Sequence, residues 1–336
     1  VETIYLGGGT PSLMSLSSLS RIVGEIERCY PVRGRRGIEE PCAEITIEVN
    51  PDDATAEYMR GVASAGFNRV SIGIQSFSDS HLKWMNRRHN GAQASDVFYN
   101  ARGAGLDNIS IDLIFGFEAL SHREWQENII SAIELSPEHI SAYQLGVEPG
   151  TLLYKDYERG DYNSLPDQES YEQYSLLQKM LSDAGYIQYE ISSFCKSGME
   201  SRHNSSYWDF TPYLGFGPSA HSFDGKIRYS NPSSLKQYLA SAESRKFTRK
   251  IEAIGGRERF NEYIMLSLRR VKGIKMVGLA NGFNVPGVGD YVVPESFYHI
   301  VYQLLDRGDL VQEGDYIRIP PDKLFQSDRI IRALFR

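Results

Sequence analysis

Five short runs of β-branched and other apolar residues recur through the first part of the chain, and a helix-like pattern follows each of them. The runs are Thr3–Leu6, Ile45–Val49, Val70–Ile74, Ile109–Phe115 and His139–Leu145. Strands that alternate with covering helices form βαβ units, and such units build a parallel sheet. We therefore expect an α/β fold with a barrel or partial barrel. An open doubly wound sheet is the alternative, because periodicity does not report whether a sheet closes.

The segments between these runs carry the apolar stripes of covering helices. One stripe lies within Leu19–Ile26 and another within Trp125–Ile133. Ser121 and Glu124 precede the second stripe with the spacing of a capping box, in which each side chain bonds the backbone N–H of the other residue. Both segments are predicted to be helices that pack on the sheet.

The pattern changes after Pro149. A Tyr-rich helix is predicted over Tyr171–Ala184 and a strand over Tyr186–Phe194. The following residues, up to Phe223, are dense in Gly, Pro, aromatic residues and His, a composition that is typical of an ordered loop.

The C-terminal third is predicted to form a domain of a different kind. Helical patterns cover Ser234–Glu243, Arg257–Leu268 and Ser296–Arg307, and a hairpin joins Leu310–Gln312 to Tyr316–Ile319. Helices followed by a two-stranded wing indicate a winged-helix-like α+β domain.

Charge separates the same two regions. Residues 1–225 carry 17 Lys and Arg against 31 Asp and Glu, whereas residues 226–336 carry 19 against 12. We therefore expect two domains, 1–225 and 226–336. A basic domain attracts nucleic acid, an anionic membrane surface or an acidic partner. Docking against the acidic region of the same chain is the simpler interpretation, and we expect no nucleic acid.

Composition and cysteine usage narrow the class of protein. The chain has 336 residues, 41% of them hydrophobic and 24% charged, as in ordinary globular proteins. The most apolar stretch, Ile109–Phe117, is interrupted by Asp112 and is far shorter than the roughly 20 residues of a membrane span. The three cysteines, Cys29, Cys42 and Cys195, are too sparse for a disulfide framework. The sequence thus predicts a cytoplasmic protein without a membrane span.

Polar residues stand at the ends of several predicted strands. Gly7–Pro11 supplies three consecutive glycines, Glu48 and Asn50 end the second strand, and Gln75 ends the third. Ligands of parallel sheets and barrels bind at the carboxyl ends of the strands. Gly7–Pro11 is not a P-loop, because no Gly-Lys-Ser/Thr follows. A tight turn and simple solvent exposure are the alternatives for these positions.

Asp112 lies within an otherwise apolar strand. An unpaired carboxylate in such a place costs several kcal/mol, so Asp112 is expected to have a cation or hydrogen-bond donors nearby. Arg87 is the candidate cation. A purely structural Asp112–Arg87 pair and a role in ligand binding are equally compatible with the sequence.

Two histidines, an indole and two phenols gather in about twenty residues, within His203–Trp208 and Pro212–Phe223. Imidazole ligates haem iron axially, and aromatic rings stack on a macrocycle. The alternative is an aromatic loop that closes one mouth of the barrel, with His203 held by hydrogen bonds.

Taken in order, seven motifs resemble those of the radical S-adenosylmethionine (SAM) proteins related to oxygen-independent coproporphyrinogen III oxidase. The motifs are Gly7–Ser12, Ile47–Pro51, Gly73–Phe77, Asn86–Asn90, Asp112–Gly116, Tyr143–Thr151 and His203–Trp208. The last of them, together with Gly215–Phe223, resembles the HemW branch of haem chaperones.

This resemblance implies a partial (β/α)6 barrel that binds SAM and a [4Fe–4S] cluster, followed by a C-terminal domain. It also implies two sets of site residues. The SAM site would consist of Gly8, Gly9, Thr10, Glu48, Gln75, Arg87, Asp112 and the backbone near Gly146. The haem motif would consist of His203, Asn204, Tyr207 and Trp208.

The chain departs from the family pattern in two places. The three cluster cysteines of the family, spaced Cys-x3-Cys-x2-Cys, follow a first strand that would precede Val1, so we expect the first strand and the cluster loop upstream of this sequence and no metal ligands within it. In addition, the Arg33–Arg36 segment is an expected exposed loop without an assigned role.

Three functions were weighed on these grounds. We favour a haem-binding, SAM-dependent chaperone that passes haem to an acceptor protein. The alternative within the family is an oxidase that decarboxylates the propionates of coproporphyrinogen, and the resemblance alone leaves open whether the chain is an enzyme. A nucleic-acid-binding module is the weakest interpretation, because the basic region lacks a clear recognition helix.

Overall fold

The computed structural model describes residues 1–34, 42–247, 249–276 and 291–336. The chain divides into two compact units, Val1–His203 and Asn204–Arg336. Arg35 and Arg36, which belong to the predicted exposed loop, lie outside the described residues. We describe each unit by itself.

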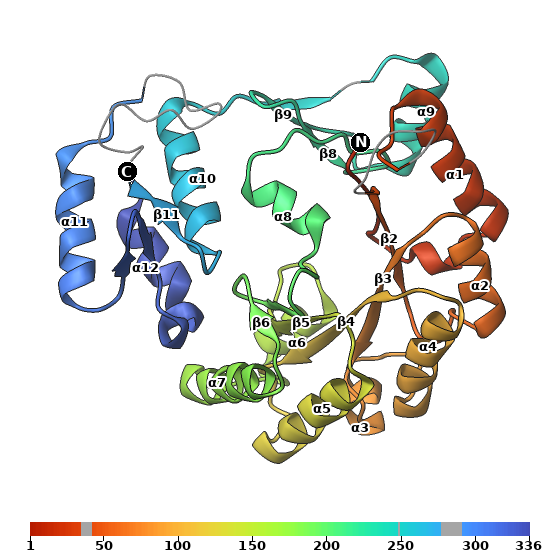
Figure 1. The fold of residues 1–336 in the computed structure, drawn as a ribbon, viewed down its shortest axis with the longest axis horizontal. Helices are drawn as coiled ribbons and strands as arrows, with labels where there is room; N and C mark the ends of the chain where they lie inside the picture. Colours follow the sequence, from red (N-terminus) through yellow and green to blue (C-terminus); the bar gives the residue numbers. More distant parts are fainter. Residues whose placement is uncertain (35–41, 248, 277–290) are drawn as a thin grey trace. The chain divides into compact units, whose positions relative to one another are not determined.

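The first unit contains a seven-stranded sheet whose first five strands are parallel and adjacent in chain order (Figure 1). These strands are β1 (Thr3–Leu6), β2 (Glu44–Val49), β3 (Arg69–Gln75), β4 (Asn108–Phe115) and β5 (His139–Gln144). Each strand therefore pairs with the next strand along the chain, without the reversal of order that defines a doubly wound sheet. The doubly wound alternative is wrong, and the partial-barrel prediction is confirmed.

The sheet ends in two short antiparallel strands. β7 (Ser193–Cys195) pairs with β5, and β6 (Ile187–Gln188) pairs with β7. The sequence predicted one strand over Tyr186–Phe194. The segment instead turns back on itself, because the backbone N–H of Tyr189 donates to the carbonyl oxygen of Ser193.

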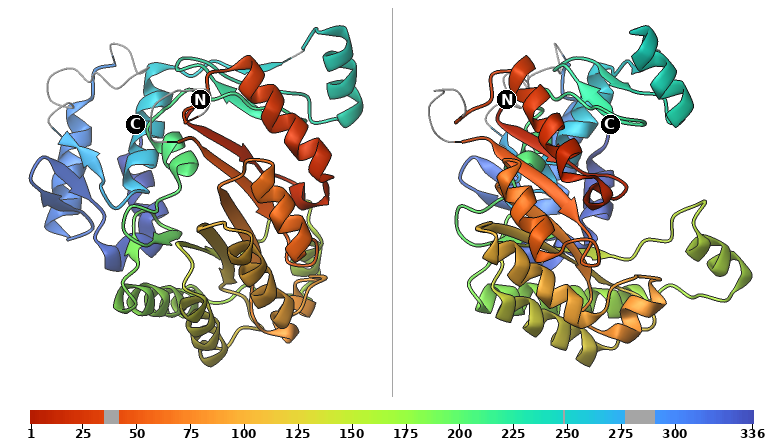
Figure 2. Two further views of the ribbon diagram at one scale, coloured as in Figure 1. Left: turned by 45° about the vertical axis from the view of Figure 1, so that its right-hand side comes forward. Right: turned by 90° about the vertical axis from the view of Figure 1, so that its right-hand side faces the viewer.

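Helices cover the outer face of the parallel strands (Figure 2). They are α1 (Leu16–Cys29), α2 (Ala56–Ser64), α4 (Gly91–Gly103), α5 (His122–Leu135) and α7 (Asp167–Asp183). The short elements η1 (Pro11–Leu13), α3 (Asp79–Trp84) and α6 (Leu152–Arg159) occupy the connections. The predicted stripes are buried, with Leu19 and Trp125 both fully inaccessible. This layer contributes the apolar core of the unit.

The opposite face of the same strands is polar. Successive residues of a strand point to opposite faces. In β2, for example, Ile45 and Ile47 face the helices, whereas Glu44, Thr46 and Glu48 belong to the other face. Side chains on this inner face pair across neighbouring strands as Thr3–Glu44, Glu48–Ser71, Ser110–His139 and Asp112–Ser141. The inner face is therefore available for chemistry rather than for packing.

The second unit contains two three-stranded antiparallel sheets, most of the helix Arg202–Trp208, and four further helices among its described residues. The first sheet consists of β8 (His221–Phe223), β9 (Arg228–Ser230) and β10 (Lys250–Glu252). The second consists of β11 (Ile274–Lys275), β12 (Val311–Glu313) and β13 (Tyr316–Arg318). The helices are α9 (Leu235–Ser244), α10 (Gly256–Leu268), α11 (Glu295–Asp306) and α12 (Ser327–Leu334), with the 3₁₀ turn η3 (Pro321–Gln326) before α12.

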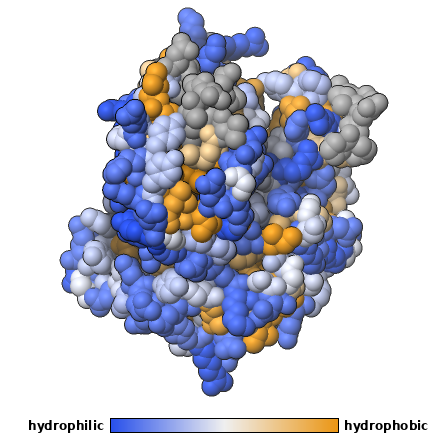
Figure 3. Space-filling model, turned by 60° about the vertical axis from the view of Figure 1, so that its left-hand side comes forward, coloured by the Kyte–Doolittle hydropathy of each residue, from blue (hydrophilic) through white to orange (hydrophobic). Residues whose placement is uncertain are grey.

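The order helix, strand, helix and hairpin from α10 to β13 agrees with the predicted winged-helix-like domain. The boundary at residue 225 stays a prediction, and the β8–β9 hairpin pairs across it. One expectation is wrong: the segment from His203 to Trp208 is not a loop but most of helix α8 (Arg202–Trp208). No described helix has the length and apolar character that a membrane crossing requires. On the face shown in Figure 3, hydrophobic residues form separate groups among hydrophilic ones.

Candidate SAM and haem sites

The triglycine turn after β1 leaves the backbone open. Gly8 and Gly9 have φ values of 77° and 66°, a conformation that side-chain-bearing residues rarely adopt. Both glycines are exposed, and Thr10 is half-buried at the start of η1. The backbone N–H of Gly8 donates to Oε2 of Glu48 over 3.0 Å. The predicted motifs Gly7–Ser12 and Ile47–Pro51 are therefore in direct contact.

Glu48 is held from both sides. Its Oε1 accepts a hydrogen bond from the Tyr5 hydroxyl over 2.7 Å. A β carbon on Gly7 would lie 2.5 Å from the Tyr5 ring and 2.7 Å from Oε1 of Glu48. Gly7 is therefore required because the Tyr5–Glu48 pair occupies the space of its missing side chain.

Asp112 lies on the inner face next to these groups. The pKa of Asp112 is raised to about 6, chiefly by burial and also by the negative charge of Glu48, while hydrogen bonds from Ser141 and Ser71 and the Arg69 charge oppose the shift. Ser71 Oγ also lies 3.4 Å from both carboxylate oxygens. A buried carboxyl group beside the negative charge of Glu48 leaves this place short of a positive charge.

Gln75 ends β3 in an unusual conformation. It has φ 66° although it is not a glycine, and the pairing of β3 with β4 shifts register between Ile72 and Gln75. Its amide nitrogen Nε2 would lie 2.9 Å from a β carbon on Gly73. The side chain thus folds back over Gly73 on the inner side of the strand end.

Arg87 contributes a positive charge to the same region. Burial lowers its pKa, while the charges of Asp52 and Asp112 raise it. The described residues contain no direct Arg87–Asp112 ion pair, so the purely structural pair that the sequence left open is wrong, because Asp112 is bonded by Ser71 and Ser141 instead. Gly146 lies exposed in the loop after β5.

The predicted SAM residues therefore gather at the carboxyl ends of β1 to β5. SAM carries a sulfonium and an ammonium group, a carboxylate and a nucleoside. The carboxylates of Glu48 and Asp112 suit its positive groups, the Arg87 guanidinium suits its carboxylate, and the open backbone of Gly8 and Gly9 permits close approach. The residues present fit SAM, and their roles as ligands belong to the proposal below.

His203 is the first residue of the predicted haem motif and the last residue of the first unit. Its Nδ1 hydrogen bonds with Thr3 Oγ1 over 2.8 Å, and its ring stacks on Tyr5 at 4.7 Å between centroids. Its backbone N–H donates to Glu44 over 2.9 Å. Burial and the Arg69 charge lower the pKa of His203 to about 4, so the ring is neutral near pH 7. Neutral imidazole is the form that binds metals.

The other three residues of the motif belong to the second unit. The Tyr207 ring meets the Tyr213 ring edge-on at 4.8 Å. The indole Nε1 of Trp208 is buried without a hydrogen-bond partner among the described residues. Asn204 is half-buried. The motif residues lie on consecutive turns of α8, which places His203 and Tyr207 four residues apart on one side of the helix.

The described residues do not provide a site for an iron–sulfur cluster. They contain no group of three His, Cys, Asp or Glu side chains that could hold a metal ion. Cys29 and Cys42 are exposed and Cys195 is buried. In the radical SAM superfamily the cluster supplies the electron for SAM cleavage.

Sequence reasoning missed several residues of this region, namely Tyr5, Arg69, Ser141 and Asn128. Tyr5 and Ser141 could have been found from strand alternation, which places them on the face of Glu48 and Asp112. Arg69 begins β3, is only 1% exposed, and its Nε has no partner among the described residues. Asn128 lies on α5, where the helical pattern gives no signal for it.

Comparison with known proteins places this geometry in a family. The model of the radical SAM superfamily matches residues 1–129. The heme chaperone HemW of Bacillus subtilis is 34% identical over 275 residues, covering 82% of this chain and 71% of the relative. The heme chaperone HemW of Escherichia coli is 36% identical over 237 residues, covering 70% of this chain and 59% of the relative.

A solved structure shares the fold. The coproporphyrinogen III oxidase HemN of Escherichia coli, a radical SAM enzyme, superposes with a TM-score of 0.79 and 18% identity, covering all of this chain and 78% of HemN. SAM and a [4Fe–4S] cluster are the cofactors of this superfamily. The fold, the ordered motifs and the similarity to the Bacillus subtilis protein together show that the chain belongs to the HemW family of radical SAM proteins.

Proposed function

We propose that this chain binds SAM at the carboxyl ends of β1 to β5, binds haem through His203, and passes that haem to an acceptor protein in the cytoplasm. The curated relatives are named heme chaperones. The observation that carries the proposal is the meeting of Gly8, Glu48 and Asp112 at one edge of the sheet.

Each residue of the SAM site has a distinct task. Glu48 and Asp112 hold the positively charged groups, and Arg87 holds the carboxylate. Gly8 and Gly9 let the backbone approach the methionyl group, Thr10 adds a hydroxyl beside them, and Gln75 and the backbone near Gly146 line the nucleoside side. Tyr5 orients the Glu48 carboxylate, because the Tyr5 hydroxyl donates a hydrogen bond to Oε1 of Glu48.

His203 supplies the iron ligand of the haem site. Its ring is held in place by the hydrogen bond between Nδ1 and Thr3 Oγ1. Asn204, Tyr207 and Trp208 follow on the same helix, and the aromatic members offer faces to a porphyrin.

Haem titration of the purified chain tests the haem assignment. We expect His203→Ala to weaken haem binding at least tenfold and to change the Soret band, whereas replacement of His299, an exposed histidine of α11 outside these motifs, by Ala leaves both unchanged. Unchanged affinity and spectrum of the His203→Ala protein, at an unchanged melting temperature, would overturn the assignment.

Equilibrium dialysis with labelled SAM tests the proposed SAM site. We expect Glu48→Gln and Asp112→Asn to weaken SAM binding, with exposed Glu57→Gln as the control. Anaerobic incubation of a cluster-bearing protein with coproporphyrinogen adds a discriminating result, because formation of protoporphyrinogen would assign the chain to the oxidase and not to the chaperones.

A further inference from the structure

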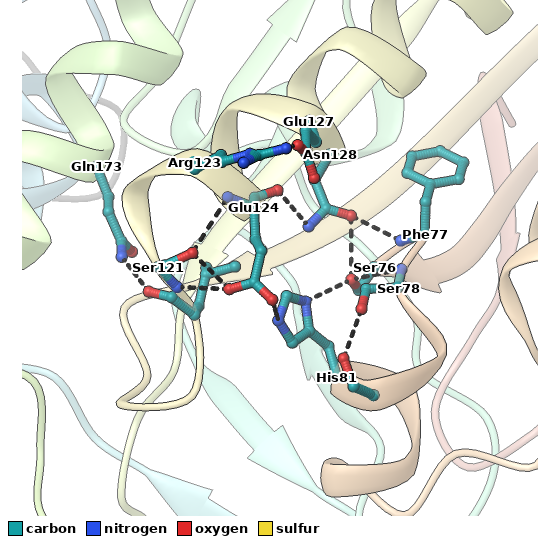
Figure 4. Close-up of polar contacts among 12 residues, drawn as sticks. Ser76, Phe77, Ser78, His81, Ser121, Arg123, Glu124, Glu127, Asn128 and Gln173 are labelled. Atoms are coloured by element: carbon teal, nitrogen blue, oxygen red, sulfur yellow. Dashed lines mark hydrogen bonds and ion pairs between the residues drawn. The ribbon is translucent and has the colours of Figure 1, made fainter.

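We propose that Asn128, on the outer helix α5, is a positioning residue that holds Gln75 in the conformation needed for SAM binding. This inference rests on the proposed function of the SAM site. It concerns a residue that lies outside the pocket and belongs to none of the motifs above. The contacts are drawn in Figure 4.

The starting point is the backbone of Gln75. A non-glycine residue with φ near 66° is strained, and such residues persist only where their surroundings fix them. Gln75 is also the residue whose side chain folds over Gly73 toward the strand ends. An alternative backbone conformation at Gln75 would redirect this side chain away from the pocket.

Asn128 fixes the segment directly after Gln75. Its Oδ1 accepts hydrogen bonds from the backbone N–H of Phe77 over 2.7 Å and from the Ser76 hydroxyl over 3.0 Å. Its Nδ2 donates to the carbonyl oxygen of Glu124 over 3.0 Å. Asn128 is only 4% exposed, and Ser76 only 1%. Because a buried polar group that loses its hydrogen-bond partner is costly, the network resists rearrangement.

The proton positions in this network follow from its chemistry. A backbone N–H can only donate, so the Asn128 atom that faces Phe77 must be the oxygen. That oxygen cannot donate, so the Ser76 hydroxyl must give it its single proton. The Ser76 oxygen then accepts from the backbone N–H of Ser78 over 3.1 Å and from His81 Nδ1 over 3.1 Å. Every donor and acceptor site of Ser76 is thereby used.

This assignment excludes a hydrolytic triad. Ser76, His81 and Glu124 stand in line, with His81 Nε2 3.4 Å from Glu124 Oε1. However, the Ser76 proton is directed to Asn128 and not to His81, and both Ser76 and His81 are buried. A nucleophile must present its oxygen to a substrate and its proton to the base. The cluster therefore holds the turn and does not react.

A second contact holds the other side of Gln75. His89 Nε2 hydrogen bonds with the carbonyl oxygen of Ile74 over 3.0 Å, and His89 is 4% exposed. His89 lies two residues after Arg87. The residue before Gln75 is thus hydrogen bonded to His89, and the residues after it are hydrogen bonded to Asn128 on α5.

The test combines SAM affinity with backbone protection. Asn128→Leu removes all three hydrogen bonds of the Asn128 side chain. We expect this variant to weaken SAM binding roughly tenfold, measured by equilibrium dialysis of labelled SAM with the full chain. Hydrogen exchange of the Phe77 amide should become faster in the same variant. Asn100→Leu is the matched control, because Asn100 on α4 bonds only the carbonyl oxygen of Ala54 among the described residues.

The double variant separates positioning from general destabilisation. If Asn128 acts through Gln75, then Gln75→Ala and Gln75→Ala/Asn128→Leu bind SAM with the same affinity. Asn128→Asp should recover SAM binding at low pH, where its protonated carboxyl reproduces the acceptor and the donor of the amide. The SAM affinity of Asn128→Asp is compared with that of the unaltered chain at the same pH.

Each outcome has a definite meaning. Unchanged SAM affinity of Asn128→Leu, with the Phe77 amide exchanging faster, overturns the positioning role alone. Additive losses in the double variant overturn it as well. Absence of SAM binding by the unaltered chain overturns the proposed function, and the positioning role with it.

Discussion

Asp112 shows how one side chain sets the charge of the proposed pocket. Burial, followed by the charge of Glu48, raises its pKa to about 6, so the carboxyl group is mostly ionised at pH 7.5 and mostly protonated at pH 5. A positively charged ligand interacts more strongly with the ionised form. SAM binding and the protonation of Asp112 therefore oppose each other.

The first prediction is a pH dependence of SAM binding. We expect affinity to fall severalfold as the pH is lowered from 7.5 to 5, with the midpoint near 6, because protons compete with the ligand for Asp112. Equilibrium dialysis across this range measures it. Asp112→Asn should bind weakly with a flatter profile, and an equally steep profile in that variant would locate the titrating group elsewhere.

The same pKa predicts an effect on stability of the opposite sign. A carboxyl group whose pKa is raised on folding contributes stability that is present below its ordinary pKa and is lost as the pH rises through about 6. Asp112→Asn should therefore stabilise the ligand-free chain at pH 7.5, by about 1 kcal/mol because the side chain is partly exposed, and much less at pH 4. Urea unfolding at both pH values provides the comparison. Equal effects at the two pH values would contradict the assignment.

Gly7 is a further position at which one atom matters. Gly7→Ala places a β carbon against both Tyr5 and Glu48, so it should displace the Glu48 carboxylate and weaken SAM binding severalfold. Gly24→Ala is the control, because nothing lies within 4 Å of the added carbon in α1 and alanine favours a helix by about 1 kcal/mol. Equilibrium dialysis measures the SAM affinity of both variants, and their melting temperatures show whether either variant is destabilised. Equal SAM affinity of the Gly7→Ala and unaltered chains would contradict the packing argument.

At the scale of elements, α5 links the outer layer to the pocket. Its capping box is complete: the Ser121 side chain accepts from the Glu124 N–H, and the Glu124 carboxylate accepts from the Ser121 N–H. Hydrogen bonds that the Ser121 hydroxyl and the Ser121 backbone N–H donate to the Glu124 carboxylate lower the pKa of Glu124. The start of this helix is therefore fixed about two turns before Asn128, so the cap supports the contact with the turn after β3.

Ser121→Ala should destabilise the chain by about 1 kcal/mol through loss of this cap. The exposed Ser131 on the same helix bonds only the carbonyl oxygen of Glu127 among the described residues, and Ser131→Ala should be within about 0.5 kcal/mol of the unaltered chain. Urea unfolding measures both. Indistinguishable stabilities of the two variants would show that the cap contributes nothing.

Elements with strong periodicity could be predicted from sequence, and those defined by tertiary contacts could not. The five parallel strands and their covering helices were predicted because burial imposes a period on the residues. α8 was not predicted, since its short sequence has no apolar stripe and its first turn is fixed by Glu44 from a distant strand. The split of the predicted strand Tyr186–Phe194 depends likewise on a turn contact within it.

At the scale of the whole molecule, the chain consists of two units with different architectures. The first presents the candidate SAM site on the inner face of its sheet, and the second carries most of the haem motif. The predicted domain boundary at residue 225 passes between two paired strands, β8 and β9. A separation at residue 203 leaves that sheet whole.

Two fragments test which boundary is physical. We expect residues 204–336 to melt cooperatively and residues 226–336 to melt at a lower temperature. The shorter fragment loses β8 and the buried side chains of Phe210 and Phe223. Circular dichroism during heating measures both. Equal melting temperatures would favour the boundary at residue 225.

The residues of the candidate site could be predicted where an unusual residue type stands at an informative place in a strand or turn. Glu48 and Asp112 are acidic residues within strands, and the triglycine turn is conspicuous in any chain. The contacts that orient them were not predictable, because Tyr5, Arg69 and Asn128 come from residue types that occur throughout ordinary sheets and helices. Only the fold brings Asn128 to the turn after β3.

The central claim is that one pocket for SAM lies at the carboxyl ends of β1 to β5. A crystal structure of the chain with SAM tests it most directly. The account predicts that SAM contacts the turn at Gly8 and Gly9, with Glu48 and Asp112 beside its positively charged groups and Arg87 beside its carboxylate. SAM bound at any other place on the chain would contradict the account.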